Sequence, residues 1–257
     1  MEEHDLLEQA EAALVRDGKL IRLDGEGQAV FVGDTHGDLE ATETVIDRYL
    51  NREHRIVFLG DYVDRGPHSR ENLDLLLSLK VEHPDRIYLL MGNHEGWDAL
   101  QFYPADFWGR LDPEAARRYA ELLSQLPLAV AAENGILALH GALPDVETLE
   151  EVGQIVFGSE PWRQIVWGDW QDAPGRLLGD AGGRPQFGRD HFEERMERFE
   201  KRVLIRSHQP HAPLTLYGDR CVTIFTSSAY GPVTRRIVRV GLGREVRTAA
   251  DLQFEVI

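Results

Sequence analysis

Five short motifs carry residues that could bind metal ions or transfer protons. They are GDTHG at 33–37, GDYVDRG at 60–66, GNHE at 92–95, HG at 140–141 and RSHQ at 206–209. Each of the first four follows directly on a short apolar run. Because ligands in open α/β sheets bind at the carboxyl ends of strands, motifs far apart in the sequence can converge on one crevice. Their glycines let the backbone turn sharply and bring polar side chains together.

The candidate ligands in these motifs form a mixed set of nitrogen and oxygen donors. They are Asp34, His36, Asp61, Asn93, His140 and His208. Carboxylates, an amide and imidazoles without a thiolate suit manganese, iron, zinc or cobalt better than calcium or a structural zinc site. Six ligands suffice for two ions if one carboxylate bridges them. Ions about 3.5–4 Å apart can activate a hydroxide and stabilise in-line displacement at phosphorus, so the set predicts hydrolysis of a phosphate ester.

The charge of the chain limits its partners. The 257 residues carry a formal net charge of −16, so an anionic substrate must be attracted by a local feature. Two divalent ions, with Arg65 nearby, would form such a feature. The same balance argues against nucleic acid as a partner, because nucleic-acid binders usually display a basic face.

The elements that position these motifs follow from the apolar runs. Runs at 29–32, 55–59, 86–91 and 136–139 predict strands, with helices at about 38–51 and 68–82 between the first three. This alternation is typical of βαβ units and a largely parallel sheet. Beyond residue 200, runs at 203–205, 214–217, 222–225 and 234–240 are separated by Gly or Pro turns and predict a second sheet with antiparallel pairs. We expect an α/β fold in which two mixed sheets pack face to face, flanked by helices, as a single domain over 1–257.

Two segments stand outside this alternation. Residues 1–25 predict an N-terminal helix, at 3–17, followed by a lead-in strand. Residues 97–126 contain clustered aromatic side chains and then a helix from about Pro113. This helical excursion beside the site could line a substrate pocket or pack a small core of its own, and we favour the small core.

The sequence also predicts the compartment. No run of 18 apolar residues occurs, so we expect no membrane partner. The N-terminus is acidic and lacks the order of a secretory signal. Cys221 is the only cysteine, which excludes an intrachain disulfide, and we expect it to be a small core residue. We therefore expect a cytoplasmic protein.

The five motifs, in this order, resemble those of the phosphoprotein phosphatase family within the calcineurin-like metallophosphoesterases. The resemblance covers about 29–240 and includes WGD at 167–169 and SSAYG at 227–231. It implies the four-layer metallophosphoesterase fold and a protein serine/threonine phosphatase, with phosphotyrosine as a further candidate substrate. It also implies two divalent ions. We expect manganese, with iron, zinc, cobalt or nickel as alternatives.

The resemblance also implies a role for each metal ligand. Asp34, His36 and Asp61 would hold the first ion. Asp61 would bridge to the second ion, which Asn93, His140 and His208 complete.

The same resemblance makes His94 the general acid and Asp64 the residue that orients its ring. A carboxylate beside a histidine fixes the tautomer and favours the imidazolium that an acid needs. Arg65 would grip phosphate oxygens with its planar fork.

Two further substrate contacts follow less directly. Arg184 is our choice for a second phosphate-binding arginine, although Pro185 follows it where the family has glycine, and Arg189 is the alternative. Tyr230 matches a family tyrosine near the metals. Arg206 could contact substrate, but we favour a strand-end residue paired with an acid.

Two other functions compete with the protein phosphatase. Dinucleoside polyphosphate hydrolases, such as those acting on diadenosine tetraphosphate, resemble this chain in the three metal motifs. They typically read GNHD where this chain has GNHE, and RSHQ and SSAYG are not expected in them. A scaffold that has lost catalysis would lack a ligand or the acid histidine, and here all are present. We therefore favour a phosphatase acting on a phosphorylated protein or a small phosphoester.

Overall fold

Two β-sheets carry most of the strands in the computed structural model, which describes residues 3–50 and 53–257. The five-stranded sheet runs in the order β14 (Gln253–Val256), β13 (Arg236–Gly241), β2 (Gln28–Val32), β3 (His54–Phe58) and β4 (Ile87–Leu89). Its β2, β3 and β4 strands are parallel, and β13 and β14 are antiparallel additions at one side. The parallel part is the βαβ unit that the sequence predicts.

The six-stranded sheet is also mixed. Its order is β1 (Leu20–Leu23), β5 (Ala129–Ala132), β6 (Ile136–Leu139), β10 (Val203–Arg206), β12 (Cys221–Thr223) and β11 (Thr215–Leu216). The β1–β5, β6–β10 and β10–β12 pairs are parallel, whereas β5–β6 and β11–β12 are antiparallel. The lead-in strand predicted before residue 25 is β1.

The two sheets face each other across an apolar core, and strand alternation divides their side chains between two layers. On β2, Ala29 and Phe31 belong to the core between the sheets, while Val30 and Val32 belong to the core that includes the helices. Phe31 lies opposite Val57 on β3 and Val238 on β13, and all three are fully buried. Because successive strand residues point to opposite faces, short runs that are apolar at every position fit strands covered on both sides. The predicted α/β class with two mixed, helix-flanked sheets is confirmed.

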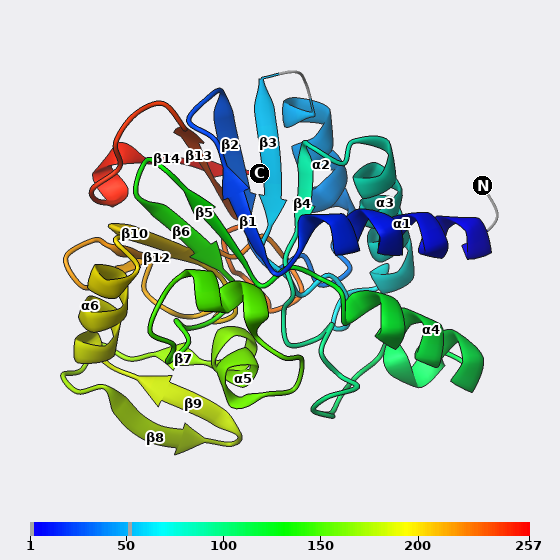
Figure 1. Cartoon of the computed structure of the whole chain (residues 1–257). Helices are drawn as coiled ribbons and strands as arrows, with labels where there is room; N and C mark the ends of the chain where they lie inside the picture. Colours follow the sequence, from blue (N-terminus) through cyan, green and yellow to red (C-terminus); the bar gives the residue numbers. More distant parts are fainter. Residues whose placement is uncertain (1–2, 51–52) are drawn as a thin grey trace.

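Within the described residues, six α-helices lie outside these sheets (Figure 1). They are α1 (Glu3–Asp17), α2 (Leu39–Tyr49), α3 (Ser69–Glu82), α4 (Pro113–Leu123), α5 (Glu160–Trp167) and α6 (Arg189–Arg198). Three short 3-10 helices are η1 (Trp108–Arg110), η2 (Glu150–Gln154) and η3 (Ala249–Asp251). None of the helices within the described ranges is long and apolar enough to cross a membrane.

Local signals explain where two of the helices begin. Asp38 caps α2 by accepting a hydrogen bond from the amide of Ala41. Asp112 caps α4 by accepting from the amides of Glu114 and Ala115, with Pro113 at the first helical position. The α2 helix ends at Tyr49, and residue 51, where the predicted helix ends, lies outside the described residues.

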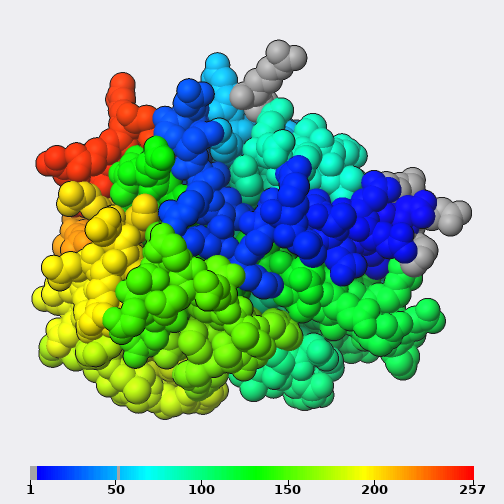
Figure 2. All heavy atoms as spheres, in the orientation of Figure 1, coloured from blue at the N-terminus to red at the C-terminus, as the bar shows by residue number. Residues whose placement is uncertain are grey.

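The N-terminal helix packs against α3 and α4 and lies across the molecular surface (Figure 2). Leu7, Ala10 and Leu14 form its buried stripe. Beside this stripe, Lys80 of α3 forms an ion pair with Asp17 at 2.5 Å, and both side chains are buried. Lys80 Nζ also donates to the carbonyls of Pro84 and Ile87, so α1 is tied to α3 by a hydrogen-bonded charge pair as well as by apolar packing.

Two details of the strand arrangement differ from the prediction. The β13 strand, which the sequence places with the other strands beyond residue 200, joins the five-stranded sheet beside β2. The β6 strand, expected with the first group, joins the six-stranded sheet beside β10. An apolar run indicates that a strand exists, but it does not specify its neighbour.

A small third sheet is also absent from the prediction. It consists of β7 (Asp169–Trp170), β9 (Arg184–Phe187) and β8 (Leu177–Ala181), at the lower edge of the molecule in Figure 1. Every residue of β8 is exposed, and Gly179 lies in the strand with φ 108°. Without a buried face, β8 has no alternation of apolar and polar residues to reveal it.

Candidate active site and metal centre

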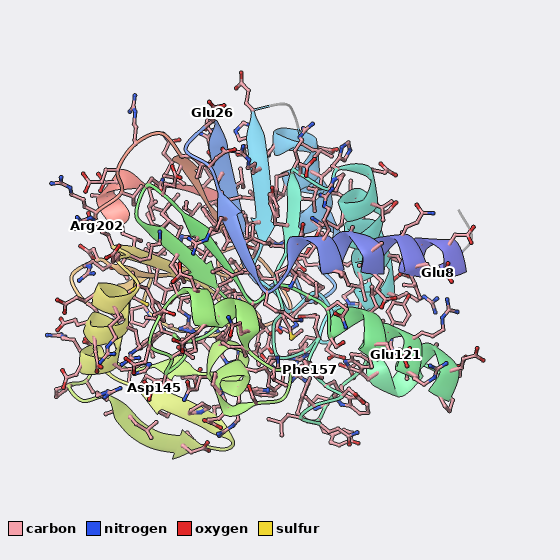
Figure 3. All side chains as sticks on the ribbon, viewed as in Figure 1. Glu8, Glu26, Glu121, Asp145, Phe157 and Arg202 are labelled. Carbon is pink, nitrogen blue, oxygen red and sulfur yellow. The ribbon has the colours of Figure 1, made fainter. Side chains whose placement is uncertain are left out.

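The six predicted metal ligands lie at one edge that the two larger sheets share. Three follow strands of the five-stranded sheet and two follow strands of the six-stranded sheet: Asp34 after β2, Asp61 after β3, Asn93 after β4, His140 after β6 and His208 after β10. Glu26, which precedes β2, lies at the opposite end of that strand (Figure 3). All six ligand side chains, including His36, are buried.

The carboxylate of Asp61 lies between two groups of ligand atoms. Its Oδ2 atom is 3.5 Å from His36 Nε2 on one side and 3.4 Å from His140 Nε2 on the other. Asp34 Oδ2 is 3.7 Å from the same nitrogen of His36. Among the described residues, Asp34 Oδ2 accepts no hydrogen bond although it is buried. Asp61 therefore has the position of a bridging ligand.

The second group centres on His140. Its Nε2 atom lies 3.0 Å from His208 Nδ1 and 3.3 Å from Asn93 Oδ1. The other ring nitrogen of His140 donates to the carbonyl of Leu59 at 2.8 Å. In a neutral ring this leaves Nε2 as an acceptor facing other acceptors, an arrangement that a cation between them would stabilise.

The first group has the same feature. His36 Nδ1 donates to the carbonyl of Val63 at 2.8 Å, which directs the lone pair of Nε2 toward Asp34 and Asp61. Histidines that bind metals usually donate their second ring N–H to a carbonyl or carboxylate in this way. The donor set therefore fits two divalent ions.

The electrostatics of the protein groups lead to the same conclusion. Burial raises the pKa of Asp34 to about 6. Burial lowers the pKa of His140, but Asp61 and Asp34 outweigh it and raise that pKa to about 9. The protein groups alone thus balance the buried carboxylates with a proton on an imidazole, and a divalent ion would replace that proton.

The backbone around the site adopts conformations that are uncommon outside glycine. The left-handed region is occupied by His36 (φ 45°), Asp61 (φ 55°), Asp64 (φ 66°), Arg65 (φ 71°) and His208 (φ 70°). Such residues cost of order 1–3 kcal/mol each and cluster at functional sites. The packing is also close, because a Cβ on Gly92 would lie 2.2 Å from Asp61 Oδ1.

Glu95 supports this backbone, a role that sequence reasoning did not assign. Its carboxylate accepts hydrogen bonds from the amides of Asp61, Tyr62 and Gly92 at 2.8, 2.8 and 3.0 Å. It therefore holds the turns after β3 and β4 together. Burial and then the charge of Asp61 raise the pKa of Glu95 to about 7. The sequence feature that could have indicated this role is the glutamate at the end of the GNHE motif.

Ser207 joins the two sheets beneath the metal ligands. Its Oγ atom accepts from the amide of Asp34 at 2.9 Å and donates to the carbonyl of Ile224 at 2.8 Å. The amide of His208 donates to Asp34 Oδ1 at 3.2 Å. The serine of RSHQ thus fixes the relative position of ligands from different sheets.

The predicted acid pair is formed. His94 Nδ1 is 2.7 Å from Asp64 Oδ2, and His94 Nε2 is 4.0 Å from Asp61 Oδ2. Burial lowers the pKa of His94, but Asp61 and Asp64 outweigh burial and raise it. The ring is therefore oriented with Nε2 toward the ligand cluster, and its role as the acid stays a prediction.

The excursion over 97–126 holds this pair in place. The amide of Phe107 donates to Asp64 Oδ1 at 2.6 Å, and Trp108 Nε1 donates to the carbonyl of His94 at 2.9 Å. The Phe102 ring lies 4.5 Å from the His94 ring, centroid to centroid. Phe107 and Trp108 are also buried, but they belong to the large core cluster that includes the sheets and helices, so the excursion does not form the separate small core that we favoured, and it supports the His94–Asp64 pair.

Arg65 is fixed at the mouth of the site. Its Nε donates to the Tyr230 hydroxyl at 3.2 Å, and one terminal nitrogen donates to the carbonyl of Pro104 at 3.0 Å. The Tyr230 ring lies 5.3 Å from the His36 ring. Tyr230, and Arg65 through its hydrogen bond to Tyr230, are thus beside the first ligand group, which accounts for two of the three predicted substrate-binding residues.

The structure distinguishes the two candidate arginines by position. Arg184 donates from Nε and a terminal nitrogen to the two carboxylate oxygens of Asp169, at 2.9 and 2.7 Å. Asp169 Oδ1 lies 3.6 Å from His208 Nε2, which links Arg184 to the metal centre. Arg189 instead pairs with the exposed Asp172 at 3.5 Å.

Arg206 differs from our expectation. It is fully buried, and in the part of the chain that the structure describes it forms no ion pair with an acid. Its guanidinium donates to Gln209 Oε1. Gln209 in turn accepts from the amide of Trp170 at 2.9 Å, so the first and last residues of RSHQ connect β10 to β7.

The family is shown by comparison with known proteins. Residues 28–212 match the model of the calcineurin-like phosphoesterase family, which is more than half of the chain. The chain therefore belongs to the calcineurin-like phosphoesterases.

Its relatives within that family are protein phosphatases by name. A probable serine/threonine-protein phosphatase of Encephalitozoon cuniculi is 30% identical over 238 residues, 88% of this chain and 52% of the relative. Serine/threonine-protein phosphatase 5 of Rattus norvegicus is 32% identical over 213 residues, 77% of this chain and 42% of the relative. The chain thus spans about half the length of these relatives.

A solved structure shows the same fold. It is a protein serine/threonine phosphatase from Saccharomyces cerevisiae described as similar to human phosphatase PP5. It superposes with a TM-score of 0.82 at 22% identity, covering 98% of this chain and 88% of the other.

Proposed function

We propose that this chain is a metal-dependent phosphomonoester hydrolase acting on phosphoserine and phosphothreonine in proteins, with phosphotyrosine as a further substrate. The observation that carries the proposal is the position of Asp61 between the two ligand groups, next to the His94–Asp64 pair. One shared carboxylate and an adjacent acid provide what displacement at phosphorus and departure of an alkoxide each require. The named relatives support phosphoproteins as the substrate class.

Each ligand has a defined part in this proposal. Asp34, His36 and Asp61 would hold one ion, and Asp61, Asn93, His140 and His208 the other. When bound, the two ions supply Lewis acidity and a water of lowered pKa. We propose manganese for both and a cytoplasmic location.

Arg65 and His94 act on the substrate, and Asp64 acts through His94. Arg65 uses two of its nitrogens on Tyr230 and Pro104, which leaves a terminal nitrogen for a phosphate oxygen. His94 holds a proton at Nε2 for the leaving oxygen, and Asp64 stabilises the imidazolium. The alkoxide of serine or threonine is a poor leaving group, so this proton transfer lowers the barrier.

A direct comparison of substrates tests the proposal. Manganese-supplemented protein is assayed on phosphoserine and phosphothreonine peptides and on diadenosine tetraphosphate under identical conditions. We expect the higher kcat/KM with the peptides, and loss of activity on all substrates after chelation. A higher kcat/KM with the tetraphosphate would instead identify a dinucleoside polyphosphate hydrolase.

A further inference from the structure

A pocket of about 470 Å³ opens beside the metal centre on the Arg184 side. We call it the β7–β11 pocket. Its walls come from residues 169–172 at and after β7, from Arg184 of β9, from residues 209–213 between β10 and β11, and from Leu216 of β11. These segments are far apart in the sequence, and the small third sheet that the sequence did not predict supplies half of them.

The pocket is continuous with the catalytic site. Asp169 and Arg184 belong to both, because they line the pocket and Asp169 lies 3.6 Å from His208 Nε2. Gln209, also in the wall, directly follows His208 in the sequence. Because the pocket adjoins the metal ligands, a substrate whose phosphate is bound there can place a neighbouring group in the pocket.

The chemistry of the wall favours an apolar occupant. The loop after β10 contributes Pro210, Ala212 and Pro213, β11 contributes Leu216, and β7 contributes Trp170. At the end near the metals, the Arg184 and Asp169 charges are joined by two hydrogen bonds. The other carboxylate of the wall, Asp172, is paired with Arg189 at 3.5 Å. A charged side chain would therefore be desolvated beside charges that already have partners, which is costly, whereas burying apolar surface is favourable.

The wall is held in position before any ligand arrives. Gln209 Oε1 accepts from the amide of Trp170 and from the fully buried Arg206. The Tyr217 hydroxyl donates to the carbonyl of Gln171. These hydrogen bonds connect the loop after β10 to β7, so a side chain that enters does not have to order the wall itself.

We propose that the β7–β11 pocket is a specificity subsite for one large apolar side chain, such as leucine or phenylalanine, that flanks the phosphorylated residue of a peptide substrate. The inference rests on the proposed phosphatase function. Removal of methylene groups from an apolar substrate side chain typically costs about 10–200-fold in kcat/KM. Replacing leucine by serine at the flanking position should therefore reduce kcat/KM at least about tenfold.

The test uses phosphopeptides in which leucine or serine is placed in turn at each position near the phosphoserine. Wild-type protein should show one position with a strong leucine preference. The variant Ala212→Asp, which adds a charge to the wall, should lose most of that preference. Its kcat/KM on p-nitrophenyl phosphate should stay within about twofold of wild type, because that substrate is too short to enter the pocket.

A matched control adds the same charge elsewhere. Ala250→Asp, on the exposed η3 segment away from the pocket, should keep the leucine preference. No preference at any position, or equal effects of the two variants, would overturn the subsite and leave the phosphatase proposal intact. Hydrolysis of p-nitrophenyl phosphate without hydrolysis of any peptide would remove the phosphatase proposal, and the subsite with it.

Discussion

At the scale of single residues, the site depends on contacts that polarise or orient a few side chains. His94 is the clearest case, because its ring bonds Asp64 on one side and faces the ligand cluster on the other. Neither His94 nor Asp64 is among the proposed metal ligands. His94 can therefore be replaced without removing a metal ligand.

His94→Asn should therefore collapse turnover on phosphoserine peptides by about 10²–10⁴-fold, the usual size of general acid catalysis. The loss should be much smaller with p-nitrophenyl phosphate, whose leaving group needs little protonation. Steady-state kinetics on both substrates, with metal content measured on the same sample, provide the readout. Equal losses on the two substrates would contradict the role of acid.

The single cysteine gives a prediction about the core. Cys221 on β12 is fully buried, and burial raises the pKa of its thiol to about 12. Since the thiolate is the reactive form, the native protein at pH 8 should not react with a thiol reagent. Labelling should become complete in denaturant. Rapid labelling without denaturant would show that β12 is not packed as described.

The residue scale also shows what the sequence could specify. Glycine-flanked motifs predicted six candidate ligands and the His94–Asp64 pair, and the structure brings these side chains together because they follow strand ends at one edge. The supports were not identified. Glu95 and Ser207 act on backbone amides, and a backbone amide is present at nearly every position, so the sequence does not indicate which ones a side chain will reach.

At the scale of elements, the N-terminal helix is fixed by one buried charge pair. Lys80 and Asp17 have side chains that are 0% and 6% exposed. Lys80→Met would leave Asp17 buried without its partner, and such changes cost about 3–5 kcal/mol. Denaturant unfolding should show this loss, and the double variant Lys80→Met/Asp17→Leu should recover part of it.

A surface ion pair between the same helix and the turn after α3 serves as the control. Arg16 and Asp85 lie 2.9 Å apart but are 53% and 85% exposed. Arg16→Ala should cost no more than about 1 kcal/mol, because solvent screens exposed pairs. If the Arg16 and Lys80 variants lose similar stability, the buried pair is not what ties α1 to α3.

Some strands, and the neighbours of others, could not be predicted from the sequence. The predicted apolar runs coincide with strands, but β5, β9 and β14 were not among them. The exchange of β6 and β13 between sheets was not predicted either, because neighbouring strands are chosen by packing over long sequence separations. The exposed β8 strand has no apolar face and gave no signal. Arg184, the candidate for a second phosphate-binding arginine, and the β7–β11 pocket both depend on this third sheet.

At the scale of the whole molecule, the net charge of −16 opposes the local attraction of the site for phosphate. Arg235 does not offset this negative charge locally, because it pairs with Asp38 at 3.0 Å and with Glu40 at 3.4 Å. The surface beyond the metal centre should therefore repel additional negative charge on a substrate.

A phosphopeptide with basic flanks should accordingly have a higher kcat/KM than one with acidic flanks at low salt. The ratio should approach one as ionic strength rises from about 0.01 to 1 M, where the Debye length falls from about 30 to about 3 Å. Kinetics at several salt concentrations measure this ratio. A ratio that does not change with salt would mean that contact specificity, and not the field of the molecule, sets the preference.

In the function proposed above, six side chains from two sheets hold two divalent ions around Asp61. Elemental analysis of active protein, after removal of loosely bound metal, measures the number of ions. Wild-type protein should contain two divalent ions per chain, and Asp61→Asn, which weakens the shared ligand, should lose most of both while the protein remains folded. A fully active wild-type protein with one ion or none, or an Asp61→Asn variant that keeps two, would contradict the claim.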